Sequence, residues 1–252
     1  MRQLRDRHDD VPAFVLHAYP YKETSAIVET FTETAGRVPM VAKGAKRPRS
    51  ELRGLLQAFQ PLALSWAGMG ELKTLVKAEW RGGLPLATGA ALLCGFYLNE
   101  LLLKLLPRED PHPALFAEYA SALHALTGDA HPAARAATLR RFELRLLAEL
   151  GYALPLAHEV DTGAPIDADE RYHYAFDRGP RLVARDPEAH GPVVRGATLL
   201  ALANAHYPDA DVAAEAKRLM RSVLDHYLEA RGIESRRVVQ DLAALEDDKE
   251  MR

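Results

Sequence analysis

The most concentrated group of residues able to do chemistry is a cationic run of eleven residues, 43–53, called the basic loop below. It contains one acid, and its five cations are Lys43, Lys46, Arg47, Arg49 and Arg53. Glycine, proline and serine are interleaved with the charges, which is typical of an exposed loop. Such a loop favours contact with phosphate groups, because lysine and arginine side chains carry the opposite charge. A contact of this kind does not read a sequence. The alternative interpretation is a solvated, charge-rich turn.

Charge is divided unevenly along the 252-residue chain. Residues 1–85 hold 13 Lys/Arg against 9 Asp/Glu, a net charge of +4, which leaves −7 for residues 86–252 and −3 overall. A basic first part and an acidic second part predict that a polyanion contacts the first part of the chain.

Signals for catalysis are poor. The sequence has no GxSxG, no P-loop, no GxGxxG after a strand and no HExxH. The acids of residues 161–170 lack the regular spacing of cation ligands. The single cysteine, Cys94, excludes an internal disulfide and a cysteine-based zinc site. We therefore expect a protein that is not an enzyme and that needs no metal or cofactor.

Neither the N-terminus nor the apolar run of residues 90–106 predicts a membrane protein. The first ten residues have no apolar segment of the signal-peptide type. Asn99, Glu100 and Lys104 interrupt the apolar run, so a buried helix fits it better than a membrane span. We expect a cytoplasmic protein with no membrane contact.

Alternation of apolar and polar residues dominates from Pro12 to Trp80. Five alternating segments, near residues 14–19, 27–31, 38–42, 62–66 and 72–80, predict five short strands. Five strands in about 70 residues favour a small closed β-barrel, either an OB-fold or an SH3-like barrel. The basic loop then joins two barrel strands. Lys73, on the fifth segment, is a further candidate contact for DNA, and Tyr19, Tyr21 and Trp66 are candidate base-stacking residues.

The period becomes helical after residues 82–85, which predicts an α+β protein with a barrel domain at 1–82 and a helical domain at 83–252. Helices are expected at 88–106, 113–126, 132–150, 194–205 and 213–231. Proline at the start of the second and third of these suits a first helical turn, and Gly128 and Gly151 suit their ends. One small β-hairpin is expected within the polar segment of about residues 152–192.

Arginines gather on the predicted helix 132–150. Arg141 and Arg145 fall on one face, beside leucines 144 and 147, and Arg140 is adjacent. Such a patch suits an acidic peptide with an apolar tip. The alternative is ordinary surface charge with partners one turn away.

Several blocks of the sequence resemble the RecO family of bacterial recombination mediators. The most specific are Ala-Lys-Gly-Ala-Lys-Arg-Pro-Arg-Ser at 42–50, Leu-Leu-Gln-Ala-Phe-Gln-Pro at 55–61 and Gly-Glu-Leu-Lys-Thr-Leu at 70–75. Weaker matches are Tyr-Leu-Asn-Glu-Leu at 97–101, Arg-Phe-Glu at 141–143 and the pair Ser235-Arg236. The resemblance extends over about residues 12–243.

The resemblance implies an N-terminal OB-fold and a helical domain. It implies binding of single- and double-stranded DNA, annealing of complementary strands, and cooperation with RecR in loading RecA on DNA coated with single-stranded DNA-binding protein (SSB). Arg140 or Arg141 would contact the acidic SSB tail. Many relatives carry a four-cysteine zinc module in the segment that corresponds to 152–192, which has no cysteine here, so this chain resembles the zinc-free branch. An alternative function is a protein-interaction adaptor that binds SSB and RecR and contacts DNA only secondarily.

Overall fold

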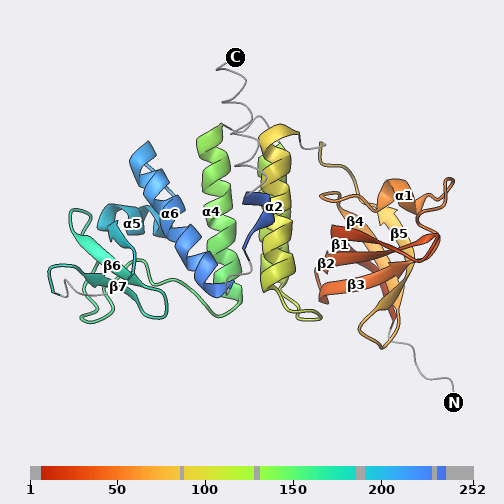
Figure 1. Cartoon of the computed structure of the whole chain (residues 1–252), viewed down its shortest axis with the longest axis horizontal. Helices are drawn as coiled ribbons and strands as arrows, with labels where there is room; N and C mark the ends of the chain where they lie inside the picture. Colours follow the sequence, from red (N-terminus) through yellow and green to blue (C-terminus); the bar gives the residue numbers. More distant parts are fainter. Residues whose placement is uncertain (1–6, 86–87, 128–130, 186–190, 229–231, 237–252) are drawn as a thin grey trace. The chain divides into compact units, whose positions relative to one another are not determined.

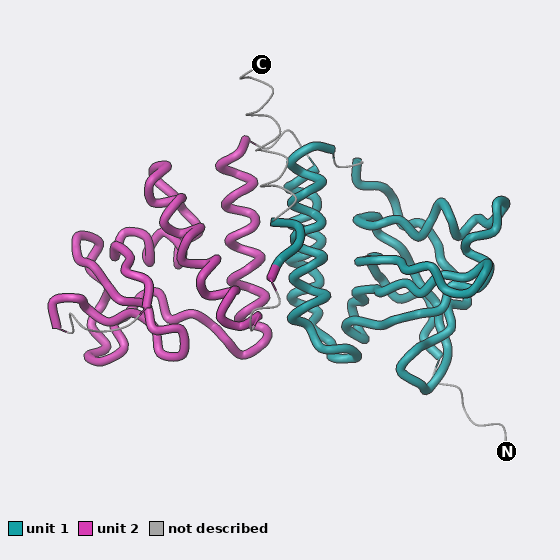
Figure 2. Tube along the Cα trace, in the orientation of Figure 1, with its two compact units in different colours: residues 1–128, 233–252 teal, residues 129–232 magenta. Residues whose placement is uncertain are grey.

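The computed structural model describes residues 7–85, 88–127, 131–185, 191–228 and 232–236. The chain forms two compact units, residues 1–128 with 233–252 and residues 129–232 (Figure 2). The sequence pattern changes at the predicted boundary 82/83, but the two helices that follow this boundary pack with the barrel and belong to the first unit. The barrel and these helices are therefore described together.

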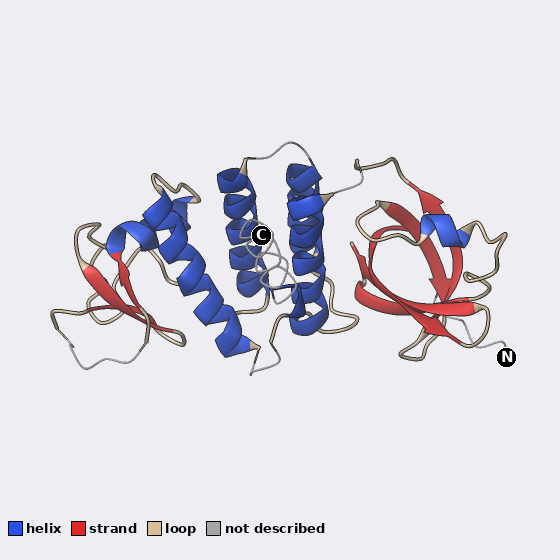
Figure 3. Ribbon diagram, turned by 45° about the horizontal axis from the view of Figure 1, so that its top comes forward, coloured by secondary structure: helices blue, strands red, loops and turns tan. Residues whose placement is uncertain are grey.

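The first unit begins with a closed five-stranded barrel (Figures 1 and 3). Its elements are β1 (Arg7–Tyr21), β2 (Ser25–Thr32), β3 (Gly36–Ala42), the short helix α1 (Leu52–Leu55), β4 (Leu62–Ala67) and β5 (Lys73–Trp80). The strand order is β1-β2-β3-β5-β4, with β3 parallel to β5 and β4 closing against β1. This order, with a helix between β3 and β4, identifies an OB-type barrel and decides against the SH3-like alternative.

The barrel interior is filled by the alternate residues that the sequence pattern indicated. Val28, Met40, Leu64 and Trp66 point inward and are almost completely buried. A β-bulge between Ser65 and Trp66 shifts the register of β4 against β5. Bulges bend a strand and help a small sheet to close on itself.

Two helices, α2 (Gly89–Leu105) and α3 (Pro113–Thr127), complete the first unit. Phe14 and Phe31, neighbours on β1 and β2, pack against the Phe116 and Tyr119 rings of α3 at centroid distances of 5.2–6.0 Å. Asn99 of α2 is buried; its Nδ2 donates to the Leu16 carbonyl at 2.8 Å and its Oδ1 accepts from the Tyr119 hydroxyl. This apolar and polar packing makes the barrel and the two helices one unit.

The connection between α2 and α3 docks on the turn between β2 and β3. The Glu109 amide donates to the Arg37 carbonyl at 3.0 Å, and Lys73 Nζ lies 2.8 Å from Glu109 Oε1. Gly36 has a φ of +66°, and a Cβ at this position would lie 2.0 Å from the Asp110 carbonyl oxygen. The close approach of the two backbones therefore requires glycine here.

The described residues of the second unit form three helices and a small sheet. The helices are α4 (Pro132–Glu149), α5 (Gly196–Asn204) and α6 (Ala210–Tyr227), and the strands are β6 (Arg171–Ala175), β7 (Gly179–Leu182) and β8 (Val193–Arg195). The predicted hairpin is β6–β7, and β8 pairs with the other edge of β6, giving the order β7-β6-β8. The predicted end of the last helix, 229–231, lies outside the described residues.

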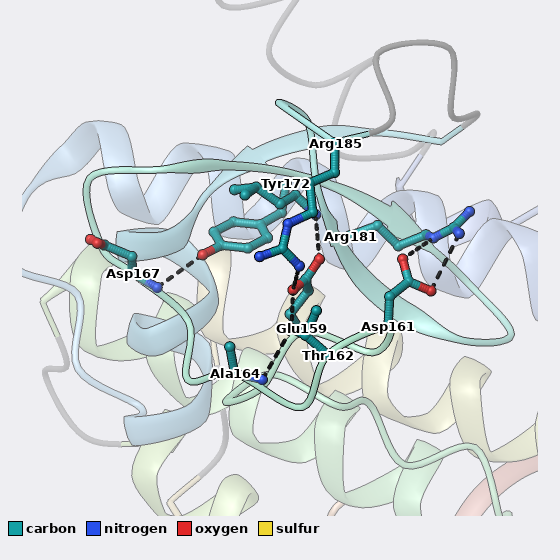
Figure 4. Close-up of polar contacts among 9 residues, drawn as sticks. Glu159, Asp161, Thr162, Ala164, Asp167, Tyr172, Arg181 and Arg185 are labelled. Atoms are coloured by element: carbon teal, nitrogen blue, oxygen red, sulfur yellow. Dashed lines mark hydrogen bonds and ion pairs between the residues drawn. The ribbon is translucent and has the colours of Figure 1, made fainter.

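Side-chain hydrogen bonds and ion pairs hold the segment around the hairpin (Figure 4). Glu159 is buried and accepts from the Thr162 hydroxyl, from Arg185 Nη1 at 3.0 Å and from the Leu182 amide at 3.4 Å. Arg181 pairs with Asp161, with its Nε 2.8 Å from Oδ2. Since the only cysteine, Cys94, lies in α2, the segment has no residues for a four-cysteine zinc module, and it folds through these polar contacts instead.

None of the helices in the described ranges is long and apolar enough to cross a membrane.

Candidate nucleic-acid interface

The basic loop follows β3 directly, and two residues in the first half of the loop, Ala45 and Lys46, fix it to the barrel. Ala45 is buried in the barrel core with only 6% of its surface exposed. The Lys46 amide donates to the Thr24 carbonyl, in the turn between β1 and β2, at 2.9 Å. Gly44 has a φ of +71°, a backbone conformation that favours glycine. The loop is therefore a formed structure that turns its cationic side chains outward.

All five cations of the basic loop are exposed, and none makes an ion pair with another part of the chain that the structure describes. The only acid in the loop, Glu51, is also exposed. Five cations without internal partners produce a positive surface whose charge is free to act on a ligand. A sequence-independent contact with phosphates is the chemistry that this arrangement supports best.

The barrel surface beside the loop adds aromatic and apolar groups. Tyr19, Ile27, Val41 and Thr74 are partners across β1, β2, β3 and β5 and form one row on the outer face. Tyr19 is 46% exposed, and its ring packs against the His17 ring at a centroid distance of 4.4 Å, so only its remaining exposed surface can stack on a base. In the turn next to the loop, Lys22 Nζ lies 5.3 Å from the centroid of the Tyr21 ring. OB-folds bind oligonucleotides on the face of strands 2 and 3 and on the loops between strands 1 and 2 and between strands 4 and 5. The basic loop adjoins the first of these loops through the hydrogen bond from Lys46 to Thr24.

Two of the predicted contacts lie elsewhere. The Lys73 side chain is only 6% exposed and its amine is paired with Glu109, so it is not part of the exposed cationic surface. Trp66 is buried in the barrel and stacks on His8 with a centroid distance of 4.5 Å, so it offers no surface for a base. Alternation placed both residues on strands correctly but did not show which of them a distant part of the chain would cover.

The two arginines proposed as a peptide contact on α4 have opposite environments. Arg141 is exposed. Arg140 is buried, and its Nη2 donates to the Oε1 of Glu143, a carboxylate with no exposed surface. Burial raises the pKa of the neighbouring Tyr207 to about 12; the Arg140 charge acts against this rise and the Glu143 charge adds to it. Arg140 therefore belongs to the interior of the second unit, and Arg141 remains the surface candidate.

No group of three or more histidine, cysteine, aspartate or glutamate side chains is placed to hold a metal ion in the part of the chain that the structure describes. The closed OB-type barrel places the first unit in the OB-fold class, whose members bind oligonucleotides and oligosaccharides.

Comparison with known sequences gives the family. The family described as "Recombination protein O N terminal" matches residues 8–83, and "Recombination protein O C terminal" matches residues 86–237. The DNA repair protein RecO of Aromatoleum aromaticum is 51% identical over 242 residues, which cover 96% of this chain and 99% of that protein. The RecO proteins of Azoarcus sp. and Dechloromonas aromatica are 48% and 50% identical, each over 96% of this chain and 99% of the relative. The chain belongs to the RecO family of DNA repair proteins.

Proposed function

We propose that this protein is a recombination mediator that binds single- and double-stranded DNA through the basic loop and anneals complementary strands. With RecR, it would help RecA load on SSB-coated DNA. The observation that carries the proposal is the set of five exposed loop cations without ion-pair partners in the described chain. The RecO family membership supplies the DNA repair context.

The proposed mechanism is electrostatic. Two complementary strands repel each other through their phosphates, and cations held on one rigid barrel reduce this repulsion while leaving the bases free to pair. The process forms and breaks no covalent bond, so we propose an activity that needs no catalytic residue, metal or cofactor. We also propose that the protein works in the cytoplasm with the nucleoid, which is consistent with a role in DNA repair.

Salt dependence of DNA binding tests the assignment of the basic loop. If about four cations each neutralise one phosphate of a single strand, log affinity falls with log salt concentration at a slope near −3, at about 0.7 per contact. We expect the Lys46→Ala/Arg47→Ala/Arg49→Ala variant to flatten this slope to about −1 and to lower the affinity at low salt. Unchanged slopes would contradict the assignment.

A charge-matched control comes from α6 in the second unit. Lys217, Arg218 and Arg221 are exposed, and their replacement by alanine removes the same net charge. This control variant keeps the wild-type slope if the loop is the contact. If both variants flatten the slope equally, only the net charge of the protein matters and the loop has no special role.

The alternative is a protein-interaction adaptor whose main surface lies on the helices, and the exposure of Arg141 favours it as a second candidate. DNA binding by the loop variant, measured beside the titration of an SSB-tail peptide, distinguishes the two functions. Both functions predict that Arg141→Ala loses peptide binding and that the loop variant keeps it. If the loop handles DNA, the loop variant loses DNA affinity, whereas in an adaptor the loop variant keeps the wild-type affinity for DNA.

A further inference from the structure

The barrel displays a large aromatic side chain that the basic loop does not include. Trp80, the last residue of β5, is 59% exposed, whereas the other tryptophan of the chain, Trp66, is buried. Exposing an indole to water is unfavourable, because its large apolar surface loses the benefit of burial. A well-positioned exposed tryptophan therefore suggests a ligand that covers its face.

The local structure holds the Trp80 ring in position. A Cβ built on Gly83 would lie 2.7 Å from Cζ2 of the indole, so the bare backbone of Gly83 lies against the ring. The indole Nε1 points at Gln60 Oε1, 3.5 Å away, and Gln60 Nε2 donates to the Leu84 carbonyl at 3.2 Å. The ring is thus supported on one side and open on the other, which suits stacking with little loss of conformational entropy.

The barrel topology relates Trp80 to the basic loop. Because β3 and β5 are parallel, the end of β3, where the loop begins, and the end of β5, where Trp80 lies, point the same way. Val41 is level with Thr74, so Trp80 lies six residues farther along β5, about 20 Å at about 3.3 Å per residue. Helix α1, which begins inside the basic loop and carries its last cation, the exposed Arg53, packs on β5. The chain then reaches β4, whose first residue, Leu62, pairs with Trp80.

We propose that Trp80 is a base-stacking site for single-stranded DNA, at the far end of a track that starts on the basic loop and crosses α1. The exposed Arg81, next in the chain, supplies a cation for the adjoining phosphate. The track fits the site size of about 4–16 nucleotides that one OB-fold covers. The inference rests on the proposed function and adds to it a preference for unpaired bases, since a duplex keeps its bases stacked inside.

Tryptophan fluorescence and labelled-oligonucleotide anisotropy test the proposal on the full-length protein with a 20-nucleotide oligothymidine. We expect DNA to quench the wild-type fluorescence and the quenching to disappear in Trp80→Phe, because Trp66 is buried. Trp80→Ala lowers single-strand affinity by between about fivefold and 150-fold, the range for loss of one base–aromatic stack. Trp80→Phe gives an intermediate affinity, and duplex affinity changes less than twofold in both variants.

The controls separate stacking from the loop contact. Val76→Ala removes another exposed apolar side chain of β5 and leaves both affinities at the wild-type value. The salt slope of Trp80→Ala stays at the wild-type value, since an indole carries no charge. The stacking site is overturned if Trp80→Ala binds single-stranded DNA within twofold of the wild-type affinity, or if DNA does not quench the wild-type fluorescence. In either case, a flattened salt slope in the loop variant would leave the proposed function intact. If the wild type binds neither DNA, both proposals fall.

Discussion

Replacing Arg140 by alanine tests whether this arginine stabilises the second unit or binds the SSB tail. The residue is 8% exposed, and its guanidinium neutralises Glu143, whose side chain is completely buried. Removing one partner of a buried ion pair costs about 3–5 kcal/mol, because the remaining charge stays buried without its counter-charge. For a unit of about 100 residues, even 3 kcal/mol lowers the unfolding midpoint by more than about 10 °C. Arg141→Ala, on the surface, should change stability by less than about 1 kcal/mol, since an exposed charged contact contributes no more than that.

The assay combines urea unfolding, followed by circular dichroism, with titration of an SSB-tail peptide at a temperature where every variant is folded. We expect Arg140→Ala to be destabilised and Arg141→Ala to lose peptide affinity at full stability. The double variant Arg140→Met/Glu143→Leu should recover most of the lost stability, since apolar residues of similar volume often replace a buried pair without cost. If Arg140→Ala is as stable as wild type and no longer binds the peptide, the buried-pair reasoning is refuted.

Three further predictions follow from contacts within the two units. Hydrogen bonds from the Thr198 hydroxyl and from Arg195 outweigh the burial of Glu215, which acts to raise its pKa, and hold that pKa below its ordinary value. Their stabilisation is therefore fully present above about pH 4.3, the unfolded value, and is lost as pH falls through the lower folded value. Urea unfolding should show Glu215→Gln less stable than wild type at pH 7, and the difference should shrink as pH falls below about 4.3. Lys73→Met should keep the wild-type salt slope of DNA binding, because the amine is buried against Glu109. A flattened slope would show that Lys73 contacts DNA. Gly36→Ala should lower the thermal midpoint severely, because its Cβ would overlap the connection between α2 and α3; a wild-type midpoint would show that this connection moves freely.

Much of the barrel follows from local pattern, because neighbouring residues on a strand face opposite sides. Val28 and Met40 alternate with polar or surface residues, and both fill the interior. On β5 the pattern predicts the strand but not the environment of each side: Val76 and Trp80 are exposed whereas Lys73 is buried. The irregular pairing of β5 with β4, where Val76 has no partner between Leu75 and Lys77, and the approach of Glu109, 36 residues later in the chain than Lys73, decide those environments, and neither has a local signal.

The helical part shows the same division between local and distant causes. Prolines and glycines predicted the ends of α3 and α4 to within about a residue. The strand β8 was not predicted, since two of its three residues, 194 and 195, were assigned to the start of the following helix. They pair only because β6 offers a free edge. Arg140 was predicted to be on the surface because a sequence does not show that Glu143, one turn away, is buried with it.

The basic loop was identified from composition alone, since dense cations among glycine, proline and serine seldom bury. Its shape was not predictable, because Ala45 inserts into the core and the Lys46 amide binds Thr24 of another turn. Trp80 was seen only as part of a strand pattern, and its exposure follows from the end of β5 and the fold of residues 81–85.

Annealing of SSB-coated complementary strands across a salt series tests the central claim most directly. The account predicts that the wild-type protein anneals the coated strands and that the annealing rate falls as the salt concentration rises. The loop variant Lys46→Ala/Arg47→Ala/Arg49→Ala should anneal slowly already at low salt. The control variant Lys217→Ala/Arg218→Ala/Arg221→Ala should anneal at the wild-type rate. Annealing by the loop variant at the wild-type rate at every salt concentration would contradict it.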